Sequence, residues 1–295
     1  MEVIKNTSHM GILIIKEIDR KLAKEIIINN HYSHKWNTSF GKINIGIFQK
    51  DNPMCLGVAS FGNLMNPNSY KSISDDFNKD SVVELNRLWI DDLLGRNAET
   101  ILIGASWKII RDGYPNIKAV QSFADGRLGC GTIYKASNFN YYGFTESLFY
   151  EDVETGITYH KVPMENTLRP TGMTKLNELW CLNRLKPFKV KTYRYIYPLY
   201  KNIKIKLKQI NYSTYDKGIT YLDDYIHNPN LIFRSFILCD IYELYQQKYN
   251  IKKYILSHYS KQQINEFYTY SIKNESILQL AKKNNKHIEN YFLIN

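Results

Sequence analysis

The 295-residue sequence lacks the features that mark membrane, secreted and zinc-binding proteins. No apolar run approaches the roughly 20 residues that a membrane-spanning helix needs. The first residues also lack the basic-then-apolar pattern of an export signal. The four cysteines stand far apart, with no CxxC pair, which argues against a structural zinc site and a disulfide scaffold. We therefore expect a globular protein of the cytoplasm without a membrane segment.

Two familiar phosphate-binding motifs are also missing. The chain contains neither the GxGxxG fingerprint of dinucleotide-binding proteins nor a P-loop. Internal repeats and low-complexity linkers are not visible either. Hydrophobic residues form 44% and charged residues 23% of the chain, and both values are typical of globular proteins. The length suits one large domain or two ordinary ones.

Acidic residues are missing from one long segment near the middle of the chain. Residues 1–178 hold 20 basic and 20 acidic side chains, so residues 179–295 carry the entire net charge of +11. Residues 179–215 contain nine Lys and Arg but no Asp or Glu. A solvated face in a lysine-rich chain is one explanation. Codon bias toward lysine does not remove acids locally, however, so we favour a surface that contacts a polyanion.

The spacing of apolar residues predicts an α/β chain with a mixed central sheet flanked by helices. Strands are predicted at 11–16, 42–49, 55–61, 81–90, 117–123, 139–144 and 189–198, helices at 18–29, 96–113 and 131–137, a polar loop at 63–80 and a hairpin at 150–161. Helical spacing resumes from residue 221. We expect a catalytic domain over 1–210, which includes the basic segment 179–210, and a helical C-terminal region over 211–295.

Two short motifs carry groups suited to proton transfer. His31 and Tyr32 follow the first predicted helix, and His34 comes three residues after His31. Histidine titrates near neutral pH, and a neighbouring tyrosine can relay a proton. Asp125 ends the most apolar predicted strand, where ligands of α/β sheets gather. The alternatives are a packing pair at a helix end for His31 and Tyr32, and a turn-forming role for Asp125.

The start of the helix predicted at 96–113 is a candidate phosphate site. Free N–H groups at a helix start bind phosphate, and Arg96 and Asn97 stand where a pyrophosphate would lie. The small Ala98 follows and leaves room for a ligand. Since many helices begin in this way, the motif alone is not specific.

The basic segment also carries aromatic residues between its cations. Cations neutralise phosphates, and aromatic rings stack on unpaired bases. The alternative is that the tyrosines belong to the core. The candidate nucleic-acid-binding residues are Lys186, Lys189, Lys191, Tyr193, Arg194, Tyr195, Lys201 and Lys204.

Over about residues 10–200, the sequence resembles the phage Mom family. The resemblance rests on the His-Tyr loop and on ELNRLWIDD (84–92), RNAE (96–99), SFADGRLGCGTIYKASNF (122–139) and KTYRYIYPL (191–199). It implies a fold similar to the GNAT acyltransferases, which bind acetyl-coenzyme A in a V-shaped opening of a mixed sheet. It also implies conversion of adenine in DNA to an N6-carbamoylmethyl form, which shields phage DNA from restriction.

The resemblance further implies roles for individual residues. Its catalytic set corresponds to His31, Tyr32, Asp125 and Ser106, and its acetyl-coenzyme A site to Arg96, Asn97, Ala98 and Ser106. The substrate would be double-stranded DNA with an extruded adenine, stacked on Tyr32, Trp36 or Tyr134. Iron is connected with this family's activity, and the candidate ligands are His31, His34 and Asp125. Residues 94–98 depart from the family pattern because the GNAT pyrophosphate loop is richer in glycine.

Two other functions remain open at this point. One is an ordinary GNAT N-acetyltransferase that acts on a small amine or a protein, which predicts a neutral cleft. The other is a non-catalytic nucleic-acid-binding protein, in which His31 and Asp125 are structural. The sequence does not set the oligomeric state.

Overall fold

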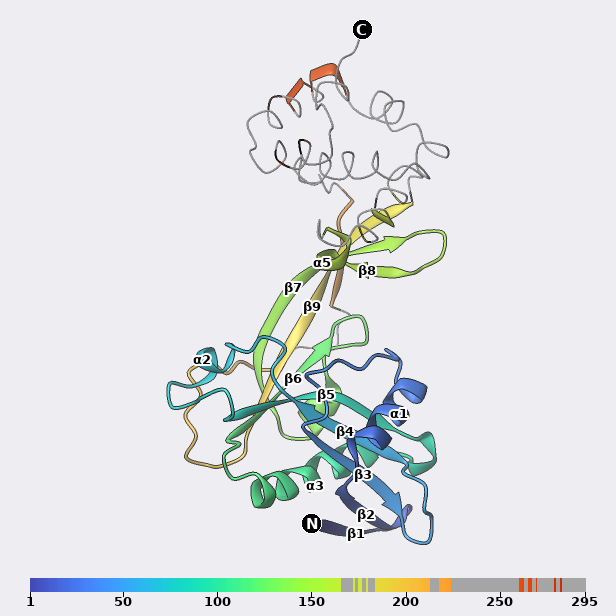
Figure 1. Ribbon diagram of the computed structural model, residues 1–295, viewed down its shortest axis with the longest axis vertical. Helices are drawn as coiled ribbons and strands as arrows, with labels where there is room; N and C mark the ends of the chain where they lie inside the picture. The colour runs from blue at the N-terminus through green and yellow to red at the C-terminus, as the bar shows by residue number, and fades with distance from the viewer. Residues whose placement is uncertain are drawn as a thin grey trace. The chain divides into compact units, whose positions relative to one another are not determined.

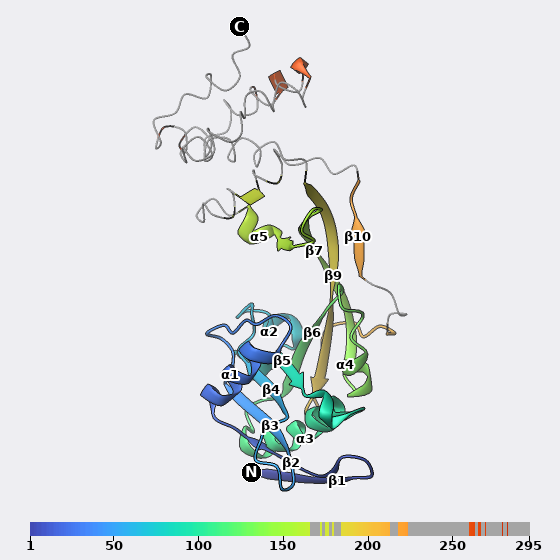
Figure 2. The same ribbon diagram turned by 90° about the vertical axis from the view of Figure 1, so that its right-hand side faces the viewer.

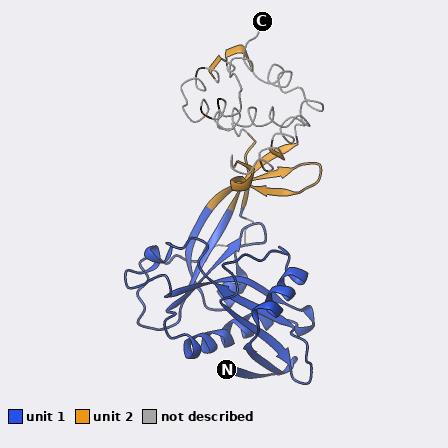
Figure 3. Ribbon diagram, in the orientation of Figure 1, with its two compact units in different colours: residues 1–145, 191–218 blue, residues 146–190, 219–295 orange. Residues whose placement is uncertain are grey.

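The computed structural model describes residues 1–165, 184–212 and 218–223, together with scattered positions between 172 and 179 and between 260 and 282. The chain divides into two compact units, Met1–Thr145 with Lys191–Gly218 and Glu146–Val190 with Ile219–Asn295 (Figure 3). Most of residues 211–295, including the helices predicted from residue 221, lie outside the described residues. The predicted boundary at residue 210 therefore stays a prediction.

The first unit is built on a mixed sheet with the strand order β1-β2-β3-β4-β5-β6-β9 (Figure 1). Neighbouring strands are antiparallel except β5 and β6, which are parallel. The predicted α/β class with a mixed sheet is thus confirmed, while β1 and the short helix α2 were not predicted. The strands are β1 (Glu2–Thr7), β2 (Gly11–Glu17), β3 (Ile43–Gln49), β4 (Gly57–Gly62), β5 (Val82–Ile90), β6 (Ala119–Asp125), β7 (Asn140–Asp152) and β9 (Leu185–Pro198). The helices are α1 (Arg20–Asn30), α2 (Tyr70–Ile73), η1 (Asp92–Leu94), α3 (Ala98–Gly113) and α4 (Thr132–Ala136).

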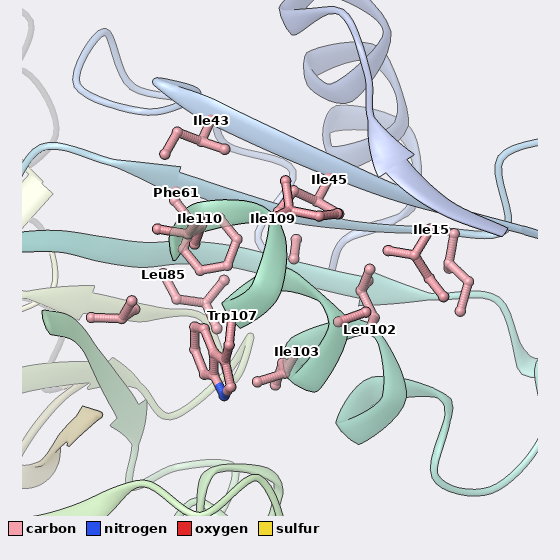
Figure 4. Close-up of a cluster of buried hydrophobic side chains, with 14 of the residues drawn as sticks. Ile15, Ile43, Ile45, Phe61, Leu85, Leu102, Ile103, Trp107, Ile109 and Ile110 are labelled. Atoms are coloured by element: carbon pink, nitrogen blue, oxygen red, sulfur yellow. The ribbon is translucent and has the colours of Figure 1, made fainter. Parts of the chain in front are cut away.

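Helices α1 and α3 cover opposite faces of this sheet (Figure 2). Helix α1 begins where the Asp19 carboxylate accepts a hydrogen bond from the Lys21 N–H at 2.7 Å, which caps the helix start. Its Ala23 and Ile27 are fully buried and pack in one cluster with Val58. The longer α3 buries its apolar stripe on the other face, as Figure 4 shows for Leu102, Ile103, Trp107, Ile109 and Ile110. Burial of these side chains fixes α3, and with it the loop that joins α3 to β5.

The sheet opens between its two parallel strands. Only Val82–Glu84 of β5 pairs with β6, through Ala119–Gln121. From Leu85 onward β5 pairs only with β4, and from Ser122 onward β6 pairs only with β9. At the branch point, the Ser122 hydroxyl donates a hydrogen bond to the Leu85 carbonyl at 3.0 Å. The divergence leaves space beside the carboxyl ends of two parallel strands, which is a usual ligand position in α/β sheets.

Strand β9 corrects one expectation from the sequence. Its alternation of cations and tyrosines predicted a half-exposed strand, yet Tyr193 and Tyr195 are each 1% exposed. The reason is that β9 is an interior strand, whose tyrosine face packs against Tyr141 and Tyr134 in the main core. The hydroxyl of Tyr195 also donates to the Cys130 carbonyl. These two tyrosines are core residues and cannot stack on DNA bases in this structure.

The second unit contains the far part of β7, the start of β9 and two short strands. Strand β8 (Thr158–His160) pairs with β7, which confirms the predicted hairpin, and β10 (Ile219–Tyr221) pairs with β9. The Arg184 guanidinium donates hydrogen bonds of 2.5 and 2.8 Å to the buried Asp152 carboxylate. These bonds hold the pKa of that carboxyl well below its usual range. Within the described part of the chain, we find no helix that is long and apolar enough to cross a membrane.

Candidate active site

A cavity of about 430 Å³ lies where β5 and β6 diverge. Its volume falls in the range of roughly 300–1,000 Å³ that is typical of small-molecule sites. The walls come from the loop after α1, from β5, from the end of β6, and from the loop 126–131 with the start of α4. The lining residues are His31, Tyr32, Leu85, Asn86, Arg87, Leu88, Phe123, Ala124, Asp125, Leu128, Gly129, Gly131, Thr132, Ile133 and Tyr134.

The cavity brings together three residues that the sequence singled out as catalytic, and it adds a fourth that sequence reasoning missed. His31, Tyr32 and Asp125 all line it, although Asp125 lies more than 90 positions after the other two along the chain. Arg87 lines it as well. Its signal was a charged side chain in the otherwise apolar second half of the strand at 81–90. Tyr134, named above only as a base-stacking candidate, is a further lining residue.

His31 is a neutral hydrogen-bonding group at neutral pH. It is 6% exposed, and burial, with smaller contributions from the charges of Arg87 and His34, lowers its pKa to about 4. The Ser33 N–H donates to His31 Nδ1 at 3.1 Å, so Nδ1 is the acceptor and the neutral ring carries its proton on Nε2. The ring lies 4.2 Å from the Tyr32 ring, centroid to centroid. His31 therefore offers an N–H donor rather than a strong base.

Tyr32, Tyr134 and Arg87 are also hydrogen-bond donors in the cavity. Desolvation, followed by the charge of Asp125, raises the pKa of Tyr32, and burial raises the pKa of Tyr134, so both phenols keep their protons. The Arg87 guanidinium donates to the carbonyls of Asn86 and Lys35 at 2.6 and 3.1 Å. These acceptors are uncharged, so the cation is not neutralised by the groups that bind it. The cavity thus presents phenol, imidazole and guanidinium donors.

Asp125 supplies the one carboxylate among the residues that line the cavity. Its Oδ1 accepts a hydrogen bond from the Arg127 backbone N–H at 2.9 Å, which forms the turn that the sequence offered as the alternative role for Asp125. The Arg127 guanidinium also binds both carboxylate oxygens, at 2.5 to 3.1 Å. The turn and the ion pair hold the carboxylate in a defined position at the end of β6. Asp125 is thus both a turn residue and a lining residue.

Ser106 does not belong to this cavity. It is fully buried within α3, where its hydroxyl donates to the Leu102 carbonyl at 2.7 Å. This bond is a common arrangement for serine inside a helix. Ser106 is therefore part of the core in this structure, and the catalytic and cofactor roles that the resemblance implies have no support from its position.

The start of α3 retains features that suit a phosphate. Asn97 adopts a left-handed conformation with φ of 69°, and its side chain accepts no hydrogen bond from the start of the helix. The first backbone N–H groups of α3 therefore have no cap from Asn97. Arg96 is exposed, and a Cβ at Gly95 would meet nothing within 4 Å. Ala98 is fully buried, so its part is to pack the helix rather than to touch a ligand. None of these residues lines the cavity.

The three candidate iron ligands do not form a metal site among the described residues. No group of three His, Cys, Asp or Glu side chains in that part of the chain is placed to hold an ion. His34 Nδ1 lies 2.8 Å from the Ile28 carbonyl and so donates to it, and Asp125 is bound by Arg127. The residues present therefore do not fit iron.

The cations of the basic segment differ in their surroundings. Lys189 pairs with Glu146 at 3.5 Å, and Lys186 and Lys191 lie over the rings of Tyr221 and Phe144. Arg194 is half-buried and donates to the Gln121 side chain at 2.9 Å. Lys201 and Lys204 are exposed. These two remain the plainest candidates for phosphate contact.

Trp36, a candidate for base stacking, packs instead beside Phe40 and Arg20.

The chain is similar to known proteins both in structure and in sequence. Solved structures that resemble it include three acetyltransferase-type proteins, all at low similarity. The ribosomal-protein-S5-alanine acetyltransferase of Vibrio fischeri is 10% identical, with a TM-score of 0.35 over 49% of this chain and 87% of that one. Arabidopsis thaliana NAA60 in complex with acetyl-CoA is 10% identical, with a TM-score of 0.38 over 63% and 99%. A GNAT-family acetyltransferase from Streptococcus pneumoniae is 13% identical, with a TM-score of 0.32 over 50% and 95%.

The sequence comparisons are more specific. The methylcarbamoylase Mom of Escherichia phage Mu is 36% identical over 197 residues, which cover 66% of this chain and 79% of that protein. The family model of the Mom protein family matches residues 12–217, a range that contains every lining residue of the cavity. The chain therefore belongs to the Mom protein family.

Proposed function

We propose that this protein is a transferase that modifies adenine in DNA, converting it to an N6-carbamoylmethyl form that protects phage DNA from restriction in the host cytoplasm. The observation that carries the proposal is the convergence of His31, Tyr32 and Asp125 on one cavity within the range matched by the family model. The methylcarbamoylase of phage Mu supports the same reaction class.

The proposed substrate explains why the cavity contains a fixed carboxylate. The exocyclic amine of adenine is a poor nucleophile because its lone pair is delocalised into the ring. It needs orientation and a proton acceptor as the new bond forms. Since His31 holds its proton on Nε2 and both phenols stay protonated, Asp125 is the acceptor in our proposal. The ion pair with Arg127 fixes the orientation of this carboxylate.

The donors of the cavity suit the other reactant. In an acyl-transfer step the adenine nitrogen bonds to the thioester carbonyl carbon, and the coenzyme A thiolate leaves. Negative charge develops on the carbonyl oxygen as this bond forms, and fixed N–H or O–H groups stabilise that charge best in a partly desolvated site. Arg87 and the Nε2–H of His31, which both line the cavity, are our candidates for this role. Tyr32 is 63% exposed at the cavity mouth, where its ring would stack on an extruded adenine.

Acetyl-coenzyme A is our proposed donor, with Arg96 and the uncapped N–H groups of α3 holding its pyrophosphate. When bound, it supplies an activated two-carbon unit. Simple acyl transfer would give an N-acetyl product, whereas the proposed product is joined through carbon and ends in an amide. The proposed product therefore also requires a nitrogen donor for the amide and a two-electron oxidant for the bond between N6 and the methyl carbon, because acetyl-coenzyme A supplies neither. Lys201 and Lys204 are our candidates for contact with DNA phosphates.

Mass spectrometry of nucleosides tests the proposal. DNA from cells that express the protein is digested to nucleosides and compared with DNA from cells that carry the empty vector. We expect a modified deoxyadenosine only in the first sample. An unchanged nucleoside profile, despite soluble protein, would overturn the proposal. Detection of an N-acetyl deoxyadenosine would mean that the protein carries out simple acyl transfer and does not form the carbamoylmethyl product.

A thermal-shift measurement tests the donor separately. Acetyl-coenzyme A that binds the folded protein raises its melting temperature by mass action. We expect Arg96→Glu to weaken that shift through charge repulsion, while Lys5→Glu, a change at an exposed cation on β1, leaves it unaltered. A missing shift with the wild type at millimolar ligand would point to a different donor.

A further inference from the structure

An exposed leucine lies at the mouth of the cavity. Leu128 is 68% exposed although it lines the cavity. Two other lining residues, Tyr32 and Ile133, are 63% and 40% exposed. Single exposed apolar side chains are ordinary, but three around one opening form an apolar rim at a ligand entrance. The rim calls for a ligand with apolar faces.

The loop that carries Leu128 is held firmly. The Leu128 N–H donates to the Asp125 carbonyl at 2.9 Å, and the Tyr195 hydroxyl donates to the Cys130 carbonyl. Gly131, with φ of 86°, lies so close to the Tyr195 ring that a Cβ there would come within 2.7 Å of it. Both sides of Leu128 are therefore anchored to the core. The exposed side chain stands on a rigid turn next to the catalytic carboxylate.

Charge at the same entrance matches a nucleic acid. The Lys35 carbonyl accepts a hydrogen bond from the guanidinium of Arg87, which lines the cavity, so Lys35 and Arg87 lie side by side. Lys35 is exposed, and both residues are cations. Cations beside an apolar rim complement a DNA duplex, whose phosphates flank a stack of apolar base faces.

We propose that Leu128 inserts into the duplex and fills the gap that the target adenine leaves when it enters the cavity. This inference rests on the proposed function. Extrusion of a base costs stacking and pairing free energy. An apolar side chain in the vacated space restores contact with the neighbouring bases, and leucine is one of the side chains that DNA-binding proteins use in this way. Leu128 thus acts as a positioning residue that lowers the cost of extrusion.

Fluorescence of 2-aminopurine tests this role, because the analogue brightens when it leaves the stack. One duplex carries it opposite thymine, at an adenine position found modified in cellular DNA. A second duplex carries it opposite an abasic site, where pairing no longer resists extrusion. Wild-type protein is compared with Leu128→Ala and with Leu93→Ala, a matched control in which an 81% exposed leucine of η1 outside the cavity is truncated.

We expect Leu128→Ala to reduce the fluorescence rise on the paired duplex by about tenfold and to match wild type on the abasic duplex. Leu93→Ala should match wild type on both, and Leu128→Met should restore the rise. Equal responses of Leu128→Ala and wild type on the paired duplex would overturn the inference. Equal losses on both duplexes would also overturn it, because they would mean a general binding defect. Failure of the proposed function differs from either result, since the wild type would then yield no modified adenine in cells.

Discussion

The buried His31 makes the stability of the first unit depend on pH in a predictable direction. Burial lowers the folded-state pKa of His31 to about 4, whereas the unfolded chain has a value near 6.5. We expect His31→Asn to remove this dependence. Its side-chain oxygen can still accept the Ser33 N–H, but it does not titrate in this range.

The sign follows from proton binding. Between pH 6.5 and pH 4 the unfolded state binds a proton at this site and the folded state does not, so stability falls as the pH falls through this window. The contribution is fully present above the unfolded pKa. A displacement of about 2.5 pKa units corresponds to about 3 kcal/mol, at roughly 1.36 kcal/mol per unit. The difference in unfolding free energy between wild type and His31→Asn should therefore change by about 3 kcal/mol between pH 7 and pH 4.

Urea unfolding followed by tryptophan fluorescence measures this difference, and Trp36, Trp89 and Trp107 all lie in the first unit. Glu84 is a competing group because burial raises its pKa, which makes its own contribution fall as the pH rises. It is present in both proteins, so it cancels in the difference. Parallel stability curves for the two proteins would refute the buried, neutral state of His31. A difference of opposite sign would mean that folding favours the protonated ring.

Three further predictions follow from the surroundings of single residues. Tyr195→Phe loses the hydroxyl that binds the Cys130 carbonyl, so urea unfolding should show a loss of about 1 kcal/mol, while the salt dependence of DNA binding stays as in wild type; a changed salt dependence would return Tyr195 to the DNA surface. Gly131→Ala should cost at least about 1 kcal/mol more than Gly11→Ala, because both glycines have a positive φ, 86° and 69°, but of the two only Gly131 lacks room for a Cβ; equal losses would contradict the close packing of that loop. Neutralising Lys201 and Lys204 together, as Gln, should flatten the plot of log affinity for DNA against log salt by about two units, and an unaltered slope would mean that the DNA lies elsewhere.

Much of the sheet could be predicted because its strands and helices carry strong local signals. The cap at Asp19 and the apolar spacing of Ile18, Leu22 and Ile26 located α1 within two residues. The strand β1 was missed because its two apolar residues, Val3 and Ile4, are adjacent and only Val3 is buried, so the sequence shows no alternation there. The Tyr193 and Tyr195 prediction failed for a different reason. Alternation shows that one face of a strand differs from the other, but it does not reveal that neighbouring strands and α4 cover the tyrosine face.

The site was predictable in part for the same physical reasons. His31 and Asp125 stand at the ends of a helix and a strand, positions that local patterns reveal. Arg87 was missed because its importance depends on the divergence of β5 from β6, a long-range feature that no local spacing records. Ser106 lies on the buried face of α3, so the helical spacing that places it in the core was stronger evidence than its residue type.

The catalytic role of Asp125 is tested most directly by nucleoside mass spectrometry of cells that express Asp125→Asn. Asparagine can still accept the Arg127 N–H, so the turn and the fold should persist, but the proton acceptor is lost. Asp92→Asn, at an exposed acid outside the cavity, is the matched control. We predict modified deoxyadenosine with wild type and Asp92→Asn and none with soluble Asp125→Asn. Undiminished modification with Asp125→Asn would contradict the assignment of this cavity as the catalytic site.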